Sequence, residues 1–170
     1  MIYIFFLLLQ LLMAGFMLYL LLAFVTGAPY VPSQMSRANR MIELADIKKG
    51  STIYDLGSGD GRMLFLSAAK GAHAYGVEMN PFLVYFTWLR AFFTPYKKQI
   101  HVRCKNLWTT DVSSADVVFI YLLPWRMDQL ANKLKKELKK GSIVVSNSFI
   151  FPHWKIYKQD PALHVYAFRV

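Results

Sequence analysis

The pattern of apolar and polar residues divides the chain into two parts. No Asp, Glu, Lys, Arg or His occurs before Arg37, and residues Ile2 to Val25 are almost wholly apolar, with Gln10 the one clearly polar interruption. As a helix, these 24 residues would be about 36 Å long, enough to cross a hydrocarbon layer of about 30 Å with some tilt. The pattern predicts one transmembrane helix followed by a polar domain.

Two other interpretations of the apolar segment fit less well. A cleaved signal peptide normally has basic residues ahead of a shorter apolar run. A buried core helix would normally have one polar face, and no face of this segment is polar. We therefore expect an uncleaved anchor. Arg37, Arg40, Lys48 and Lys49 follow the segment and no basic side chain precedes it. This bias predicts an N-terminus outside the membrane and a cytoplasmic domain.

The remaining pattern alternates between strand and helix periods. After a turn-rich stretch at 26–32, a helix is expected at 33–47. We expect strands at 51–56, 73–78, 100–104, 115–121 and 142–148, and helices at 60–70, 81–94 and 126–138. Strands separated by helices predict an α/β, Rossmann-like, mostly parallel and doubly wound sheet. Residues 154–157 and 163–170 predict an antiparallel hairpin at its edge. The expected organisation is an anchor at 1–27, a linker with a helix at 28–50, and one domain at 51–170.

The candidate chemistry lies where the first predicted strand breaks into a glycine turn. Asp55 precedes Gly57, Ser58, Gly59 and Gly61, and the second strand ends at Glu78, 21 positions after Gly57. A strand, a glycine turn that opens a helix and a correctly spaced second acid together predict a nucleotide-like cofactor.

Two cofactor classes compete for this turn. A dinucleotide fingerprint, G-x-G-x-x-G, needs its third glycine where this chain has Arg62. A pyrophosphate would also be repelled by Asp55, whereas the ammonium of S-adenosylmethionine (SAM) would be attracted. Glu78 could accept hydrogen bonds from the ribose diol. These features favour SAM.

Other polar and aromatic residues follow the strands that should surround this turn. Ligands of open α/β sheets bind at the carboxyl ends of the strands, which gathers further candidates at the same edge. Asn106 could bind the adenine amino group, with Leu107 or Trp108 beside the ring. Tyr121 ends the fourth strand, where the transferred methyl group should emerge. The candidates from this edge are Glu78, Met79, Asn80, Asn106, Leu107, Trp108 and Tyr121.

The charge of the chain lies wholly after the apolar segment. The formal net charge of +10 therefore belongs to the polar domain, and attraction to anionic lipid headgroups is its simplest explanation. We see no RNA-reading motif and expect neither a nucleic-acid partner nor a metal site. Cys104 is the single cysteine, which excludes an internal disulfide, and we expect it to be buried.

These motifs, in this order, resemble the small class I (seven-strand) SAM-dependent protein lysine methyltransferases. That group includes an archaeal broad-specificity enzyme and the membrane-anchored mitochondrial enzymes that methylate the ATP synthase c-subunit and the adenine nucleotide translocase. The segments that carry the resemblance are Pro29-Tyr-Val-Pro32, Asp55-Leu-Gly-Ser-Gly-Asp-Gly-Arg62, Glu78-Met-Asn-Pro81, Asn106-Leu-Trp108 and Phe149-Ile-Phe-Pro-His-Trp154.

The resemblance implies a function and further site residues. Tyr30 and Pro32 would close over SAM, and the loop at 121–125 would border the substrate channel. One departure is Asn106, where the family usually has an acid. The implied reaction is methylation of a lysine on a membrane-associated protein. No convincing general base is present; Tyr121 and Asp60 are the candidates. Methylation of a small or lipid-embedded acceptor, or a non-catalytic SAM-binding adaptor, stays open as an alternative.

Overall fold

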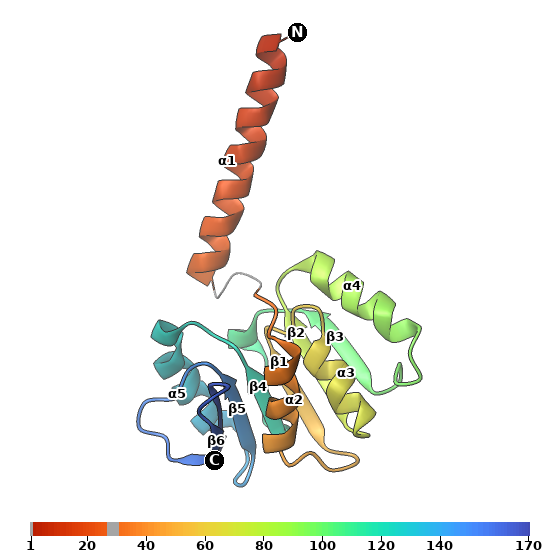
Figure 1. The fold of residues 1–170 in the computed structure, drawn as a ribbon, viewed down its shortest axis with the longest axis vertical. Helices are drawn as coiled ribbons and strands as arrows, with labels where there is room; N and C mark the ends of the chain where they lie inside the picture. Colours follow the sequence, from red (N-terminus) through yellow and green to blue (C-terminus); the bar gives the residue numbers. More distant parts are fainter. Residues whose placement is uncertain (1, 27–30) are drawn as a thin grey trace. The chain divides into compact units, whose positions relative to one another are not determined.

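The computed structural model describes residues 2–26 and 31–170. The chain forms two compact units, Met1–Val31 and Pro32–Val170. In the first, Ile2–Thr26 forms one continuous helix, α1, shown in red in Figure 1. Residues 2–21 are all exposed. The length and composition of α1 fit a membrane span, and a signal sequence near an N-terminus meets the same criterion.

The second unit is built on a seven-stranded sheet with the order β3-β2-β1-β4-β5-β7-β6. The strands are β1 (Thr52–Leu56), β2 (His73–Glu78), β3 (Ile100–Cys104), β4 (Val117–Ile120), β5 (Ile143–Asn147), β6 (Ile156–Asp160) and β7 (Val165–Arg169). The first five are parallel, and β7 inserts antiparallel between β5 and β6. The predicted, mostly parallel sheet with an antiparallel edge is thus confirmed.

Helices cover both faces of this sheet. They are α2 (Met35–Leu44), α3 (Arg62–Ala69), α4 (Pro81–Phe92) and α5 (Met127–Glu137), with short 3-10 turns η1 (Leu107–Thr109) and η2 (Pro124–Arg126). The alternating residues of β4 explain why two layers form. Val117 and Phe119 pack with α2 residues on one face, and Val118 and Ile120 pack with α5 residues on the other. A strand covered on both faces is apolar throughout.

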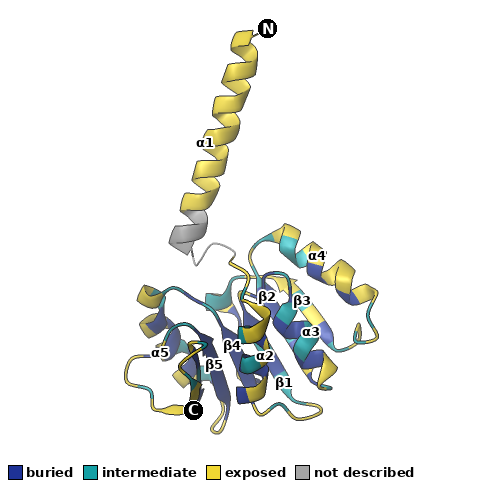
Figure 2. Cartoon of the chain, viewed as in Figure 1, coloured by how far each residue is buried: buried dark blue, intermediate teal, exposed yellow. Residues whose placement is uncertain are grey.

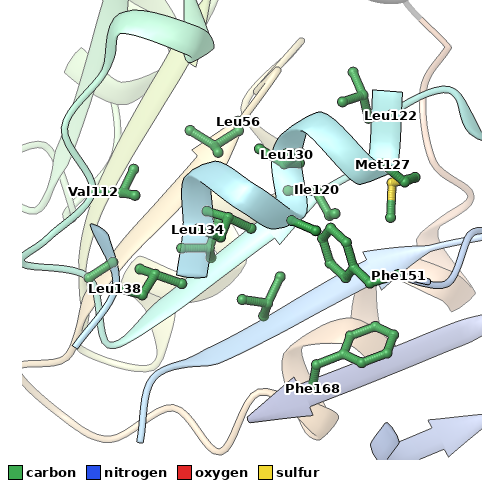
Figure 3. Packing of buried hydrophobic residues seen from close by; sticks show 14 of the residues in the cluster. Leu56, Val112, Ile120, Leu122, Met127, Leu130, Leu134, Leu138, Phe151 and Phe168 are labelled. Carbon is green, nitrogen blue, oxygen red and sulfur yellow. The ribbon is translucent and has the colours of Figure 1, made fainter. Parts of the chain in front are cut away.

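The core on the α5 side also receives the C-terminal segment. Figure 3 shows Leu130 and Leu134 of α5 close to Ile120, with Phe151 and Phe168 beside them. Leu130 and Leu134 are fully buried, and they lie four residues apart on one face of the helix. Lys135 and Lys136 are exposed, whereas Lys133 is half-buried and donates from Nζ to the Thr110 carbonyl at 2.7 Å and to Glu137 at 2.5 Å.

The element boundaries agree with the sequence to within a few residues. The last hairpin begins at Ile156 rather than 154, because Trp154 stacks on Phe151 with ring centroids 4.6 Å apart and keeps the preceding residues in a turn. Cys104 is exposed, so the expectation that it is buried was wrong. It ends β3 and its thiol lies 3.6 Å from the Met79 carbonyl.

Candidate cofactor and active site

The glycine turn between β1 and α3 has the backbone that its sequence predicted. Gly57, Gly59 and Gly61 have φ angles of 92°, 54° and 77°, in the left-handed region that only glycine adopts at little cost. At Gly61 a side chain is also excluded by space, because an added Cβ would lie 2.4 Å from Cγ2 of Thr87. At Gly57 an added Cβ would meet nothing within 4 Å. The turn thus leaves bare backbone and open space beside its first glycine.

Helix α4 supports this turn. The Thr87 hydroxyl donates a hydrogen bond of 3.2 Å to the Gly59 carbonyl, and Nη1 of Arg90 donates one of 2.9 Å to the Asp60 carbonyl. The Ser58 hydroxyl points inward, because a Cβ on Gly76 of β2 would lie 2.8 Å from it.

Glu78 connects the second strand to the glycine turn. Its Oε2 accepts a hydrogen bond of 2.9 Å from the Gly59 amide, and its Oε1 accepts one of 2.9 Å from the Asn80 amide. Each carboxylate oxygen has a further lone pair, so the side chain is fixed in place and still able to accept from a diol. Asn80 in turn caps α4 by accepting from the Phe82 amide at 3.0 Å.

Asp55 is buried, with 6% of its surface exposed. Burial raises its pKa to about 8, with Glu78 and Asp60 acting in the same direction and the Arg62 guanidinium opposing them. Near neutral pH the carboxyl group therefore holds a proton until a cation binds beside it. A bound ammonium would favour its ionised form. This is the behaviour expected at a site for a cationic ligand.

Asp60 differs from Asp55 because it has a cationic partner. Arg62 binds it through Nη2 at 2.7 Å and Nε at 3.0 Å. Burial raises the pKa of Asp60, but the hydrogen bonds and charge of Arg62 outweigh this effect and lower the pKa overall. Asp60 is therefore an ion-pair partner that is poorly suited to take a proton from an amine.

A half-buried polar network that the sequence did not predict closes another side of the candidate site. Asn147, at the carboxyl end of β5, donates from Nδ2 to the Ser33 hydroxyl at 2.8 Å, and Arg62 donates from Nη1 to the Ser33 carbonyl. The Ser148 hydroxyl donates to Oδ1 of Asn147 at 2.9 Å and accepts from Arg37 at 3.1 Å. These contacts fix residue 33 at the edge of the sheet where the strands end. The one signal in the sequence is the Ser-Asn-Ser run at 146–148, at the end of an apolar strand.

The other predicted residues come to the same edge in different ways. Asn106 caps η1, since its Oδ1 accepts from the Trp108 amide at 3.0 Å. One lone pair of Oδ1 is therefore used, and its amide nitrogen stays able to donate. Leu107 and Trp108 are half-buried, Met79 is exposed, and Tyr121 is half-buried directly after β4. Pro32 is exposed and directly precedes Ser33, whereas Tyr30 lies outside the described residues.

A separate cavity of about 260 Å³ lies against β1, β2 and β3. Tyr54, Tyr75 and His101 form a continuous stack in it, with ring centroids 5.2 and 4.9 Å apart. Arg103 and Lys105 add positive charge to its lining. Burial lowers the pKa of His101, and His73 and Arg103 lower it further. The sequence does not predict this cavity, because most of its residues come from three strands and no motif joins them.

Comparison with known proteins gives the family of the chain. Residues 55–158 match the family described as ANTKMT methyltransferase domain. The chain is similar to the lysine N-methyltransferase of the ATP synthase c-subunit from Homo sapiens, with 35% identity over 130 residues, covering 74% of this chain and 54% of that protein. It is also similar to a protein-lysine N-methyltransferase of Saccharolobus islandicus, with 35% identity over 140 residues, covering 78% of this chain and 84% of that protein. The chain thus spans about half the length of the human relative.

A solved structure has the same architecture. It is the crystal structure of an RNA methyltransferase from Salinibacter ruber in complex with S-adenosyl-L-homocysteine. The TM-score is 0.78 at 33% identity, over 82% of this chain and 93% of that one. The predicted class I methyltransferase fold is thus confirmed.

The family match begins at Asp55, at the glycine turn, and runs through the parallel sheet into β6. It therefore includes the turn, the two acids and the loops that follow β3 and β4. On this basis the chain belongs to the family of the ANTKMT methyltransferase domain.

Proposed function

We propose that this chain is a SAM-dependent protein-lysine N-methyltransferase that acts on a membrane-associated protein. The observation that carries the proposal is the pair of acids beside the glycine turn, in a chain 35% identical over 130 residues to a lysine N-methyltransferase. Asp55 is a buried carboxyl group whose pKa is raised to about 8, and Glu78 is fixed by the Gly59 and Asn80 amides.

The residues at the turn fit SAM in three respects. The open space beside Gly57 would admit the methionine part of SAM close to the backbone. Asp55 would meet its ammonium group, and Glu78 would accept from its ribose hydroxyls. Asn106, Leu107, Trp108 and Met79 would surround the adenine, with Pro32 covering the site. When bound, SAM supplies a methyl group on a sulfonium, which is open to direct displacement.

The protein's own contribution to such a displacement is to align the acceptor and to remove water from it. A lysine must first lose its proton, which costs roughly 4 to 5 kcal/mol at neutral pH from a reference pKa of about 10.4. An apolar channel lowers the pKa of an amine, because burial disfavours its charged form. Tyr121, directly after β4, would border this channel, and no dedicated base is required.

We further propose that α1 anchors the chain in a membrane, with the N-terminus outside and the second unit in the cytoplasm. Residues 2–21 of α1 are exposed and apolar, and the first basic residues follow the helix. This orientation would keep the active site in the compartment that contains SAM. It would also place the site close to lysines at the membrane surface.

The test is to incubate membranes that contain the full chain with radiolabelled SAM. We expect label in protein, on lysine, and much less label when Glu78 is replaced by glutamine. The glutamine amide would keep acceptor capacity at one oxygen but lose the charge, so Glu78→Gln should bind SAM at least tenfold more weakly by calorimetry. Label confined to the lipid extract would support a small or lipid acceptor instead. SAM binding without any label would support a non-catalytic adaptor.

RNA is a second candidate acceptor. The related Salinibacter ruber structure is described as an RNA methyltransferase, and the cavity with Tyr54, Tyr75 and His101 offers stacked rings beside Arg103 and Lys105. Bases stack on aromatic side chains in single-stranded RNA recognition. Label that ribonuclease removes would favour this candidate over the lysine acceptor.

A further inference from the structure

Helix α4 presents an aromatic surface that nothing in the described part of the chain covers. Figure 2 shows α4 as an exposed helix at the side of the sheet. Two of its residues, Thr87 and Ala91, are buried. The exposed apolar side chains on it and directly after it, which we call the α4 face, are Phe82, Tyr85, Phe86, Trp88, Leu89, Phe92 and Phe93.

The α4 face is large and continuous. The exposed fraction reaches 83% at Phe82 and 77% at Phe93. Neighbouring rings lie close to one another: the ring centroids of Tyr85 and Trp88 are 6.2 Å apart, and those of Trp88 and Phe92 are also 6.2 Å apart. With about 150–250 Å² for a full aromatic side chain, the exposed apolar area is on the order of 800 Å². Monomeric soluble proteins rarely expose apolar patches of more than a few hundred Å², so this face is expected to have a partner.

The charge around the α4 face indicates which partner. Residues 79–110 contain no Asp or Glu, and the basic residues on α4 and in the loop directly after it are Arg90, Lys97 and Lys98. Tryptophan and tyrosine prefer the interface between lipid and water, and basic residues next to them are attracted to anionic headgroups. Basic residues beside aromatic side chains would be attracted to an anionic bilayer, whereas an apolar protein partner would offer them no opposite charge.

We propose that the α4 face lies in the interface of an anionic lipid bilayer, as a membrane contact separate from α1. The apolar side chains would enter the boundary between headgroups and acyl chains, and Lys97 and Lys98 would bind headgroup phosphates. Helices of this kind lie in the interface plane without crossing the membrane.

This contact would also orient the candidate site. Thr87 and Arg90 of α4 hold the carbonyls of Gly59 and Asp60 in the glycine turn. Because α4 joins the turn on one side and would bind lipid with the other, the turn would be held at a fixed height above the bilayer. A lysine at the level of the headgroups is the acceptor that such an arrangement favours.

The experiment measures lipid contact at Trp88 in the full chain. The protein is reconstituted into phosphatidylcholine vesicles, with or without phosphatidylglycerol, whose acyl chains carry bromine near the headgroup. We expect bromine to quench part of the tryptophan emission. This part should be absent in Trp88→Phe and retained in Trp154→Phe, since Trp154 is packed on Phe151 and Phe168.

Two further variants test the chemistry of the contact. Phe82→Glu with Phe93→Glu places charges at the two most exposed positions of the α4 face, and the Trp88 quenching should fall several-fold while SAM affinity is retained. In the Lys97→Gln, Lys98→Gln variant, the Trp88 quenching should no longer be greater in vesicles that contain phosphatidylglycerol.

The outcomes distinguish α4 from α1. A chain that floats with vesicles but shows no Trp88 quenching overturns the α4 proposal and leaves the proposed anchor intact. Trp88 that is shielded from bromine, together with an oligomer that the Phe82→Glu and Phe93→Glu variant dissociates, would identify a second copy of this chain as the occupant and also overturn the proposal. Bromine quenching that is lost in Trp88→Phe and retained in Trp154→Phe supports the α4 proposal.

Discussion

Replacing Asp55 by asparagine should make the cofactor-free protein more stable and should lower its affinity for SAM. Asp55 is buried beside Glu78 and Asp60, and its pKa is raised from 3.8 to about 8. Asparagine has the size and polarity of the protonated acid, so it removes the titration while preserving the shape. The amide carries no charge for a cationic cofactor.

The magnitude follows from the two pKa values. Below pH 3.8 the carboxyl group is protonated in the folded and the unfolded chain alike and does not change the free energy of unfolding. As the pH rises from 3.8 to about 8, the folded chain binds more protons than the unfolded chain, and stability falls by about 1.4 kcal/mol per pH unit. At pH 7 the loss reaches about 4 kcal/mol, which Asp55→Asn should largely restore.

The assay is urea unfolding of the wild type and of Asp55→Asn in the same detergent, followed by tryptophan emission from about pH 5 to about pH 8. The difference between the two proteins cancels the titration of groups that do not interact with Asp55. We expect Asp55→Asn to gain stability relative to the wild type throughout this range. By calorimetry, SAM affinity should fall roughly 10- to 100-fold, the value of a hydrogen bond between charged groups.

A stability difference that stays flat over this pH range would refute the reasoning, because it would mean that Asp55 is ionised and paired before the cofactor binds. Greater stability at high pH in the wild type than in Asp55→Asn would refute it more strongly. Unchanged SAM affinity in Asp55→Asn would separate the titration from cofactor binding and remove Asp55 from the proposed site.

Three other predictions concern proton release, the glycine turn and the core. SAM binding at neutral pH should release close to one proton from the wild type and none from Asp55→Asn, seen as a binding enthalpy that depends on the buffer; equal release in both would contradict the assignment. Gly61→Ala should cost roughly 2–4 kcal/mol, from a left-handed backbone and the contact with Thr87. Gly141 has a φ of 92° and open space around it, so Gly141→Ala should lower the free energy of unfolding by only about 1–2 kcal/mol. Thermal unfolding compares the two variants, and equal losses of stability would exclude the clash with Thr87. Leu134→Ala should lower the free energy of unfolding in urea by about 2–5 kcal/mol, whereas replacement of the exposed Lys136 by alanine should lower it by less than about 0.5 kcal/mol. Similar losses in the two variants would contradict the packing of α5.

Much of the fold could be predicted because local signals and packing agree. The strands that are buried on both faces, such as β4, are short apolar runs, and the helices between them have one apolar face. The glycine turn was predictable for the same reason, since Gly61 is required both by its φ angle and by Thr87. The last hairpin began later than expected because Trp154 stacks on Phe151, a tertiary contact that residue preferences do not encode.

The candidate site was less predictable where its parts come from distant residues. Ser33 and Asn147 are 114 positions apart, and neither residue type indicates the other. The stack of Tyr54, Tyr75 and His101 depends on the register of three strands. Helix α4 was predicted as a helix, but its aromatic residues read equally well as core; only the fold leaves them exposed.

The contacts of Ser33 also determine where a mechanical load would act. Any tension carried along the chain from α1 enters the second unit at Pro32, one residue before the side chain that Asn147 binds and the carbonyl that Arg62 binds. These two partners belong to the end of β5 and the start of α3, which border the candidate cofactor site. The hydrophobic cores on the two faces of the sheet lie further along the path of the force. A pull on the chain at this point would therefore strain the walls of the cofactor site before it could unfold the domain.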